Sequence, residues 1–159
     1  MTPVFVDTSF VIALLNARDA FHKKALGEQR RLGSSRRSFV TTEAVLLELG
    51  DAFSSRERWL LFAPFLAALR RDPRATILPL NTRLLDRAVE LRSSRLDKDW
   101  GLTDCVSFTV MKELSLRDAL TSDGHFTQAG FNAMLRPKKS APAKSSVGSR
   151  KTSRLDAKE

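Results

Sequence analysis

The sequence predicts an α/β fold with three layers, α/β/α, and a central, mainly parallel sheet of four or five strands. Short runs of β-branched and aromatic residues alternate with longer segments of helical period. Strands that alternate with helices are joined by crossover connections, and these give a parallel sheet that is covered on both faces. A chain of 159 residues is long enough for one domain with its own core.

Four segments have the composition of strands and six have the period of helices. The strands are expected at residues 4–6, 38–41, 75–78 and 118–121. The helices are expected at residues 9–17, 19–32, 43–54, 56–71, 82–95 and 104–114. Within the fourth helix, Pro64 predicts a kink or the start of a second short helix.

The segment "WLLFAPFLAALRR", residues 59–71, is apolar on nearly all sides, whereas a surface helix normally has a polar face. Two explanations are open. The segment can be buried in the core of this chain, or it can be covered by a partner chain, because large apolar patches mark interfaces.

The charge is unevenly distributed between two regions. The net charge of the chain is +9, and residues 137–159 hold seven Lys and Arg against two acids, a net charge of +5. We therefore expect a domain at residues 1–136 with a net charge of only +4, followed by a basic, disordered tail at residues 137–159. The tail is either a solvated extension or an arm that attracts phosphates.

Several classes of protein are disfavoured by the composition. Cys105 is the only cysteine, so an intramolecular disulfide and a Cys-rich zinc module are excluded. Asp7 interrupts the first apolar residues, which argues against a signal peptide, and no apolar run approaches the ~18 residues of a membrane span. We expect a cytoplasmic protein without a membrane partner.

Four acids occur where predicted strands end or helices begin. Asp7 follows the first strand, and Glu43 follows the second. Asp104 begins a helix after "GLT", and Asp123 follows the last strand in "ALTSDGHF". A single acid in a first helical turn has an ordinary explanation, since it complements the helix dipole by about 0.3 to 1 kcal/mol. In a parallel sheet, however, the carboxyl ends of all strands lie along one edge, so all four acids should converge.

The convergence of these acids needs a cation. Two carboxylates about 4 Å apart repel by roughly 4 kcal/mol at an effective dielectric constant near 20. Oxygen ligands favour Mg²⁺ or Mn²⁺ over zinc. The helix N-termini at the same edge suit an anion such as phosphate. Carboxylates, a divalent ion and a phosphate together indicate metal-assisted cleavage of a phosphodiester.

Four stretches resemble, in order, the acidic motifs of PIN-domain nucleases, and within them the VapC-type toxins of toxin–antitoxin pairs. They are "VFVDTSFVIALLNARDAFHKKA", "TTEAVLLELGDAF", "DKDWGLTDCVSF" and "ALTSDGHFTQAGF". The resemblance covers about residues 3–135, and an ordered quartet is more specific than a single acid. Ser122 and Gly124 depart from the pattern, because bulkier or basic residues are frequent beside the fourth acid.

The resemblance implies a ribonuclease in which Mg²⁺ or Mn²⁺ is held by four acids and a metal-activated water attacks an RNA phosphodiester. The residues that match these acids are Asp7, Glu43, Asp104 and Asp123. The residues that match small hydroxyl side chains beside them, and orient ligands or phosphate, are Thr8, Ser9 and Thr103. The resemblance also implies a homodimer and a VapB-type antitoxin that covers the active-site groove and residues 59–71.

Other polar residues near these motifs have less defined roles. Asp99 can extend the acid cluster or lie in a solvated loop, and His125 can contact substrate. Glu48 lies one turn beyond Glu43 and is left without a role. Cys105 is expected to fill the core.

Three functions are compatible with these features. The first is a metal-dependent endoribonuclease that acts as the toxin of a toxin–antitoxin pair. The second is a non-catalytic RNA-binding module of the same fold, which would bind RNA without cleaving it. The third is a phosphate-transfer enzyme with Asp7 as nucleophile, which is disfavoured because Ser9 stands where the haloacid-dehalogenase pattern has a second Asp.

Overall fold

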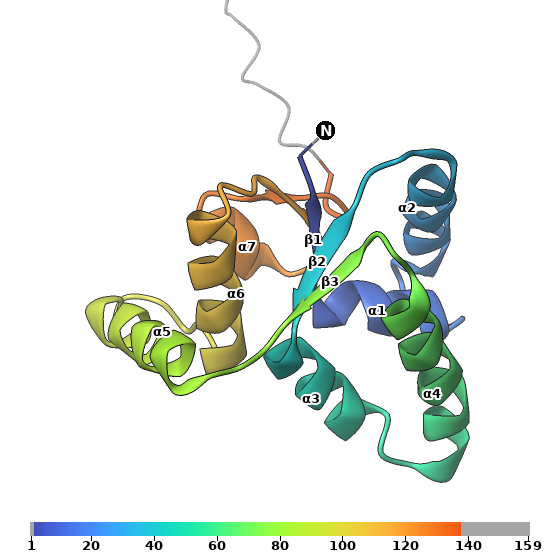
Figure 1. The fold of residues 1–159 in the computed structure, drawn as a ribbon, viewed down its shortest axis with the longest axis horizontal. Helices are drawn as coiled ribbons and strands as arrows, with labels where there is room; N and C mark the ends of the chain where they lie inside the picture. Colours follow the sequence, from blue (N-terminus) through green and yellow to red (C-terminus); the bar gives the residue numbers. More distant parts are fainter. Residues whose placement is uncertain (1, 138–159) are drawn as a thin grey trace, which may run out of the picture.

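The computed structural model of the protein describes residues 2–137, and its centre is a sheet of five strands. The strands are β1 (Val4–Val6), β2 (Phe39–Thr42), β3 (Ala75–Leu78), β4 (Asp118–Leu120) and β5 (Asn132–Ala133). Their order in the sheet is β3-β2-β1-β4-β5, and every neighbouring pair is parallel. The predicted fold class is confirmed (Figure 1).

The central position of β1 determines where the first acid lies. Phe5 pairs with Val40 of β2 on one side and with Ala119 of β4 on the other. Val4 and Phe5 are fully buried, as expected for a central strand covered on both faces. Asp7 comes directly after this strand, so it lies at the middle of the carboxyl edge of the sheet.

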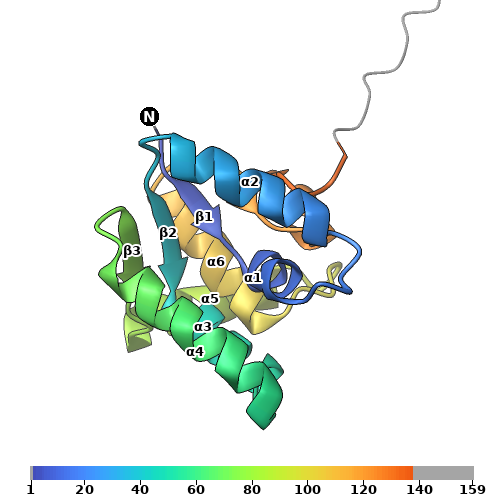
Figure 2. The same cartoon turned by 90° about the vertical axis from the view of Figure 1, so that its right-hand side faces the viewer.

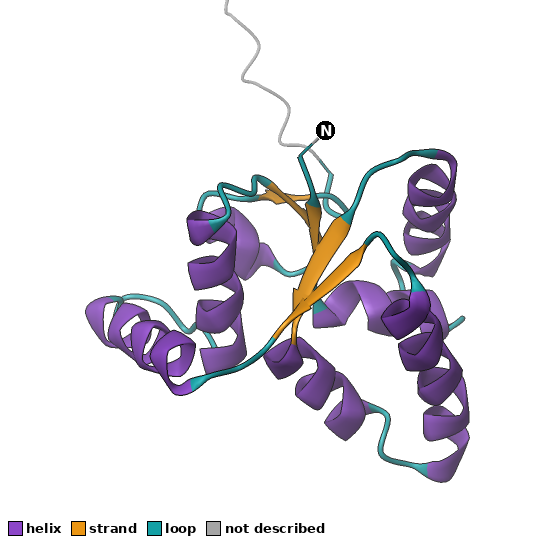
Figure 3. Cartoon of the chain, viewed as in Figure 1, coloured by secondary structure: helices purple, strands orange, loops and turns teal. Residues whose placement is uncertain are grey.

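Helices cover both faces of the sheet (Figures 1 and 2). On one face lie α1 (Thr8–Leu15), α2 (His22–Ser34) and α4 (Arg56–Arg71). On the other face lie α5 (Thr82–Ser94), α6 (Leu102–Glu113) and α7 (Gly124–Gln128). Helix α3 (Glu43–Ala52) continues from β2 at the carboxyl edge and packs against both α1 and α6. The three layers are clear when strands and helices are coloured separately (Figure 3).

An aromatic cluster fixes α6 and α7 against the sheet. The ring of Phe126 lies 5.0 Å from that of Phe108 and 6.2 Å from that of Phe5, measured between centroids. Trp100 packs against Phe108 at 5.0 Å. The three phenylalanine rings are fully buried. Because Asp104 lies in the first turn of α6 and Asp123 caps α7, this cluster positions those residues as well.

Helix α4 differs from one expectation about residues 59–71. The helix continues through Pro64, so the segment is not divided into two helices. Pro64 lies on the exposed side, where water can bind the carbonyl that its missing N–H leaves free. Burial in the core explains the apolar character of Phe62 and Leu69, while coverage by a partner chain stays a prediction for the side chains that are exposed. The exposed apolar side chains here are Trp59, Leu60 and Leu61.

The C-terminal part of the fold contains two short elements, α7 and β5, that are not among the predicted segments. The expected tail lies outside the described residues, apart from Pro137. In the described part of the chain, none of the helices has the length and apolar character needed to cross a membrane.

Candidate active site

Asp7 is a buried carboxylate, and only one of its two oxygens forms hydrogen bonds with the protein among residues 2–137. It caps the N-terminus of α1, and the residue is 5% exposed. Oδ2 accepts hydrogen bonds from the Ser9 backbone N–H (3.3 Å), the Ser9 hydroxyl (2.9 Å) and the Thr121 hydroxyl (2.7 Å). Every hydrogen bond to the Asp7 carboxylate within residues 2–137 reaches Oδ2, which leaves Oδ1 available to a cation.

Burial raises the pKa of Asp7 to about 6. The hydrogen bonds from Thr121 and Ser9 lower the pKa and offset part of this effect, while repulsion from Asp104 adds to it. A carboxylate whose pKa is raised by burial and by a neighbouring acid is a candidate functional group. Asp7 is therefore mostly ionised at pH 7.5, where it can bind a cation.

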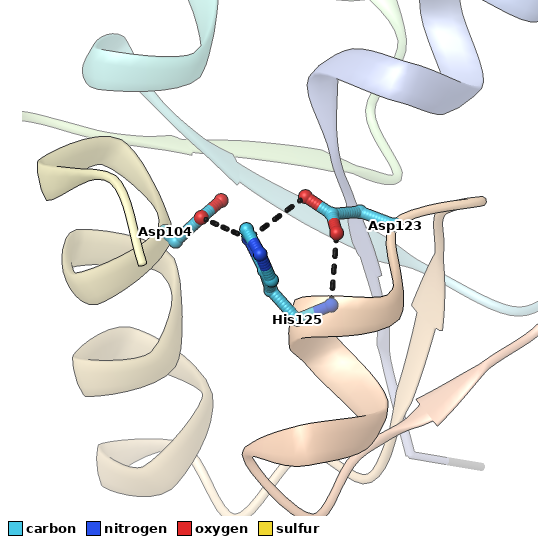
Figure 4. A group of neighbouring side chains, drawn as sticks. All are labelled: Asp104, Asp123 and His125. Carbon is cyan, nitrogen blue, oxygen red and sulfur yellow. Dashed lines mark hydrogen bonds and ion pairs between the residues drawn. The ribbon is translucent and has the colours of Figure 1, made fainter. Parts of the chain in front are cut away.

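Asp104, Asp123 and His125 form the centre of the site (Figure 4). Asp104 projects from the first turn of α6, and Asp123 caps α7 by accepting a hydrogen bond from the His125 backbone N–H at 2.8 Å. Nδ1 of His125 lies 3.0 Å from Oδ2 of Asp104 and 3.5 Å from Oδ2 of Asp123. One ligand atom from each residue lies within 4.8 Å of the others, a spacing that can hold a metal ion.

The imidazole ring of His125 separates two mutually repelling carboxylates. Burial is the main cause that raises the pKa of Asp104, and repulsion from Asp123 raises it further. The hydrogen bond from His125 and that from the Gly101 N–H, at 3.0 Å, lower the pKa of Asp104. With Asp104 ionised, Nδ1 of His125 must carry a proton. That proton partly offsets the repulsion between Asp104 and Asp123, which a divalent cation would offset more strongly.

Glu48 of α3 interacts with this centre, as Asp7 does. Partial burial is the main cause that raises its pKa, and repulsion from Asp104 and from Asp123 raises it further. The hydroxyls of Thr103 and Thr8 act in the opposite direction. Although Glu48 is exposed as a residue, its carboxylate thus interacts with the same groups as the site.

Glu43, the acid that the sequence motifs suggest, is not brought into this group. Its Oε2 accepts a hydrogen bond from the backbone N–H of Leu80, at 3.0 Å, beyond the end of β3. At 100° per residue, Glu48 shares the buried face of α3 with Val45 and Leu49, while Glu43 lies on the other side. The signal in the sequence that points to Glu48 is a charged residue on the apolar face of α3, and the motif comparison did not use it.

The remaining residues of the sequence prediction are distributed around the centre. Ser9 accepts from the Ser122 N–H at 2.9 Å and lies 2.9 Å from the Thr121 hydroxyl, so it helps to hold Asp7. Thr103 is near Glu48. Asp99 is exposed. Among residues 2–137, the group whose ligand atoms lie within 4.8 Å of one another holds Asp104, Asp123 and His125 alone, so Asp99, Asp7 and Glu48 lie outside it.

A buried hydroxyl provides a further test of whether a metal or its waters fit here. The Thr8 hydroxyl is close enough to Glu48 to lower the pKa of that carboxylate. Oγ1 of Thr8 is nevertheless buried and has no partner with hydrogen-bond geometry within residues 2–137. Unsatisfied buried polar atoms are rare and call for an explanation, such as an ion or water. Thr8 and the mainly oxygen ligands together suit a hydrated divalent ion.

Comparisons with known proteins identify the class to which this fold and site belong. A family model of the PIN domain matches residues 4–132. The chain therefore belongs to the PIN-domain family.

Two relatives are 23S rRNA-specific endonucleases named VapC20, from two strains of Mycobacterium tuberculosis, CDC 1551 / Oshkosh and H37Rv. Each is 31% identical over 128 residues, which are 80% of this chain and 95% of the relative. The crystal structure of Mycobacterium tuberculosis VapC20, described as a sarcin–ricin loop cleaving toxin, has a TM-score of 0.70 and 30% identity. That match covers 80% of this chain and 95% of the other. The resemblance to VapC-type toxins is confirmed.

Proposed function

We propose that the protein is a metal-dependent endoribonuclease that acts as the toxin of a toxin–antitoxin pair. The observation that carries the proposal is the approach of Asp104, Asp123 and His125 to within 4.8 Å, beside the buried Asp7. A non-catalytic RNA-binding module would have no need of carboxylates that repel one another. Membership of the PIN-domain family and the likeness to VapC20 support the same conclusion.

Four carboxylates are the ligands that we assign to Mg²⁺ or Mn²⁺. They are Asp7, through Oδ1, and Glu48, Asp104 and Asp123. A divalent ion supplies Lewis-acid activation of water and charge neutralisation at a phosphate. Glu48 takes the place that the motif comparison gives to Glu43, because the pKa of Glu48 responds to Asp104 and Asp123.

The chain itself holds and orders these groups. The hydroxyls of Ser9 and Thr121 hold Oδ2 of Asp7 in place. Because the carboxylate group is planar, this also restricts the position of Oδ1. The proton on Nδ1 of His125 pairs with Asp104 in the absence of metal. If the carboxylates held a cation, the ring N–H of His125 would lie beside it and could donate to a phosphate oxygen of the RNA.

The substrate that we propose is a structured ribosomal RNA, because VapC20 is described as specific for 23S rRNA and as cleaving the sarcin–ricin loop. The inhibitor that we propose is a VapB-type antitoxin, encoded with the toxin. We also propose a cytoplasmic homodimer in which the exposed Trp59, Leu60 and Leu61 of α4 contact the partner subunit.

The proposed activity is tested with a hairpin RNA that copies the sarcin–ricin loop. The purified chain and its Asp104→Asn variant are incubated with the hairpin and Mn²⁺, and the new RNA ends are mapped. We expect one dominant cut with the parent chain and none with the variant. Binding of the hairpin without cleavage by both proteins, at every metal concentration, would support the RNA-binding module instead.

A further inference from the structure

A groove on the α7 side of the catalytic centre has no role in the function described above. It has a volume of about 540 Å³ and is lined by residues of α7, β5 and the chain that follows, among them Gly124, Gln128, Phe131, Asn132 and Arg136. This volume falls in the range of about 300 to 1,000 Å³ that small-molecule sites occupy. Gly124 lies in sequence between Asp123 and His125, so the groove begins at the catalytic centre.

Arg136 is a cation without a carboxylate partner at this end of the groove. Nη1 donates a hydrogen bond to the carbonyl of Ser122 at 3.0 Å. A Cβ atom placed on Gly124 would lie 3.5 Å from the same nitrogen. Across residues 2–137, no acid forms an ion pair with Arg136. The guanidinium has five N–H donors, so most of them remain for a ligand, and phosphate matches their planar geometry.

The rest of the groove has the chemistry that recognises a nucleotide base. The half-buried Phe131 provides an aromatic surface, and its ring is supported from behind by Phe108 at 5.7 Å. Oε1 of Gln128 accepts from Nε1 of Trp100 at 3.1 Å, which leaves the Gln128 amide N–H groups as donors. Nδ2 of Asn132 donates to Asp118 at 2.8 Å, which leaves Oδ1 of Asn132 as an acceptor. Unpaired RNA bases are read by such stacking and edge hydrogen bonds.

The charge of the chain beyond this groove favours the same ligand. Pro137 lines the groove, and residues 138–159 that follow it contain seven Lys and Arg against two acids. In the sequence, these charges follow directly after the residues that line the groove. Clustered cations attract the RNA backbone without regard to its sequence.

We propose that this groove is a subsite for an RNA nucleotide next to the cleaved bond, with Arg136 bound to its phosphate and the base against Phe131. The proposal rests on the proposed function, because it takes RNA as the substrate. It adds a direction for the RNA strand, from the carboxylates across Gly124 and along α7 and β5. It also assigns to Arg136 a binding role in addition to its hydrogen bond to Ser122.

Binding is tested separately from cleavage. The probe is a fluorescein-labelled hairpin copying the sarcin–ricin loop, titrated in EDTA with the full chain carrying Asp104→Asn, and binding is followed by anisotropy at several salt concentrations. Adding Arg136→Gln should raise the Kd about tenfold and reduce the slope of log K against log [salt] by about 0.7 to 0.9, the share of one phosphate contact. Arg136→Lys should keep the salt slope, since it keeps the charge.

Two further variants separate a subsite from general attraction. Gly124→Leu adds a side chain at the entrance of the groove, so it should raise the Kd although it removes no charge. Arg70→Gln removes an exposed charge in the last turn of α4, on the other face of the sheet, and it should change the Kd less than twofold. An equal loss in Arg70→Gln and Arg136→Gln, an unchanged Kd in Arg136→Gln, or no binding by the parent chain would overturn the subsite.

The subsite and the nuclease can fail independently. If the metal-loaded wild-type chain cuts the hairpin but Arg136→Gln binds as tightly as its parent, the nuclease stands and the subsite is overturned. If the wild-type chain does not cut but binding depends on Arg136 as described, the subsite is supported and the proposed activity fails.

Discussion

The hydroxyl of Thr121 joins two acids that come from different strands. Its Oγ1 donates to Oδ2 of Asp7 at 2.7 Å and accepts from the backbone N–H of Asp123 at 2.9 Å. Asp7 follows β1 and Asp123 follows β4, so one side chain sets the spacing between the two strand ends. Ser9 reinforces this connection at 2.9 Å from Thr121.

Replacement of Thr121 by Val should therefore impair catalysis more than stability of the core. Val has nearly the shape of Thr, but it removes a hydrogen bond to a charged group, worth about 1.5 to 3 kcal/mol, and we expect kcat/KM to fall roughly 10- to 100-fold. The loss of a donor also raises the pKa of Asp7, so the acid limb of the pH–rate profile should move to higher pH. Thr121→Ser keeps the hydroxyl and should restore both; equal losses in Val and Ser variants would contradict this role.

The raised pKa of Asp7 predicts that the metal-free protein is destabilised by its own site. In the folded protein the pKa of Asp7 is about 6, whereas the pKa of an unperturbed Asp side chain, as in the unfolded chain, is 3.8. Stability from this group is thus fully present below pH 3.8 and is lost as the pH rises through 6, in total about 3 kcal/mol. In EDTA, Asp7→Asn should raise the Tm by several degrees at pH 7.5 and by little at pH 4, as measured by calorimetry. A lower Tm for the variant at pH 7.5 would refute this.

Two acids of one helix provide a matched pair for testing the metal ligands. Glu48→Gln should reduce RNA cleavage at least 100-fold, because Glu48 interacts with Asp104 and Asp123. Glu43→Gln should leave cleavage within about twofold of wild type, because Gln can still accept from the Leu80 N–H. Cleavage rates at saturating Mn²⁺ decide between them, and the reverse ranking would restore Glu43 as the ligand.

The exposed apolar side chains of α4 predict a change in assembly on substitution. Leu60 is 65% exposed, so Leu60→Glu should not disturb the core, but a charge there should weaken contact with a partner subunit. Sedimentation velocity should show a shift from dimer toward monomer. An unchanged sedimentation coefficient would contradict the proposed dimer contact through these side chains.

The sequence was sufficient for the layers of the fold but not for its smallest elements. The buried run at β1 and the period of α5 carry strong local signals, and the structure follows both. Helix α7 has five residues and β5 has two, which is too short for a period to be recognised. They form because tertiary contacts, such as Phe126 against Phe108, compensate for weak local preference.

The site was predictable as a location and less so as a set of side chains. Parallel topology brings Asp7, Asp104 and Asp123 to one edge, as strand order alone suggests. The choice between Glu43 and Glu48 depends on which face of α3 is buried, and that is decided by packing against α1 and α6. The role of Thr121 depends on the register between β1 and β4. The sequence alone does not reveal that register.

Titration with Mn²⁺ followed by electron paramagnetic resonance tests the central claim most directly, because it counts bound ions without any RNA. We expect saturable binding to the wild-type chain, loss of binding in Asp104→Asn, weaker binding in Glu48→Gln and unchanged binding in Glu43→Gln. Free Mn²⁺ signal at full intensity with the wild-type chain, at every protein concentration, would show that the converging carboxylates do not form a metal site.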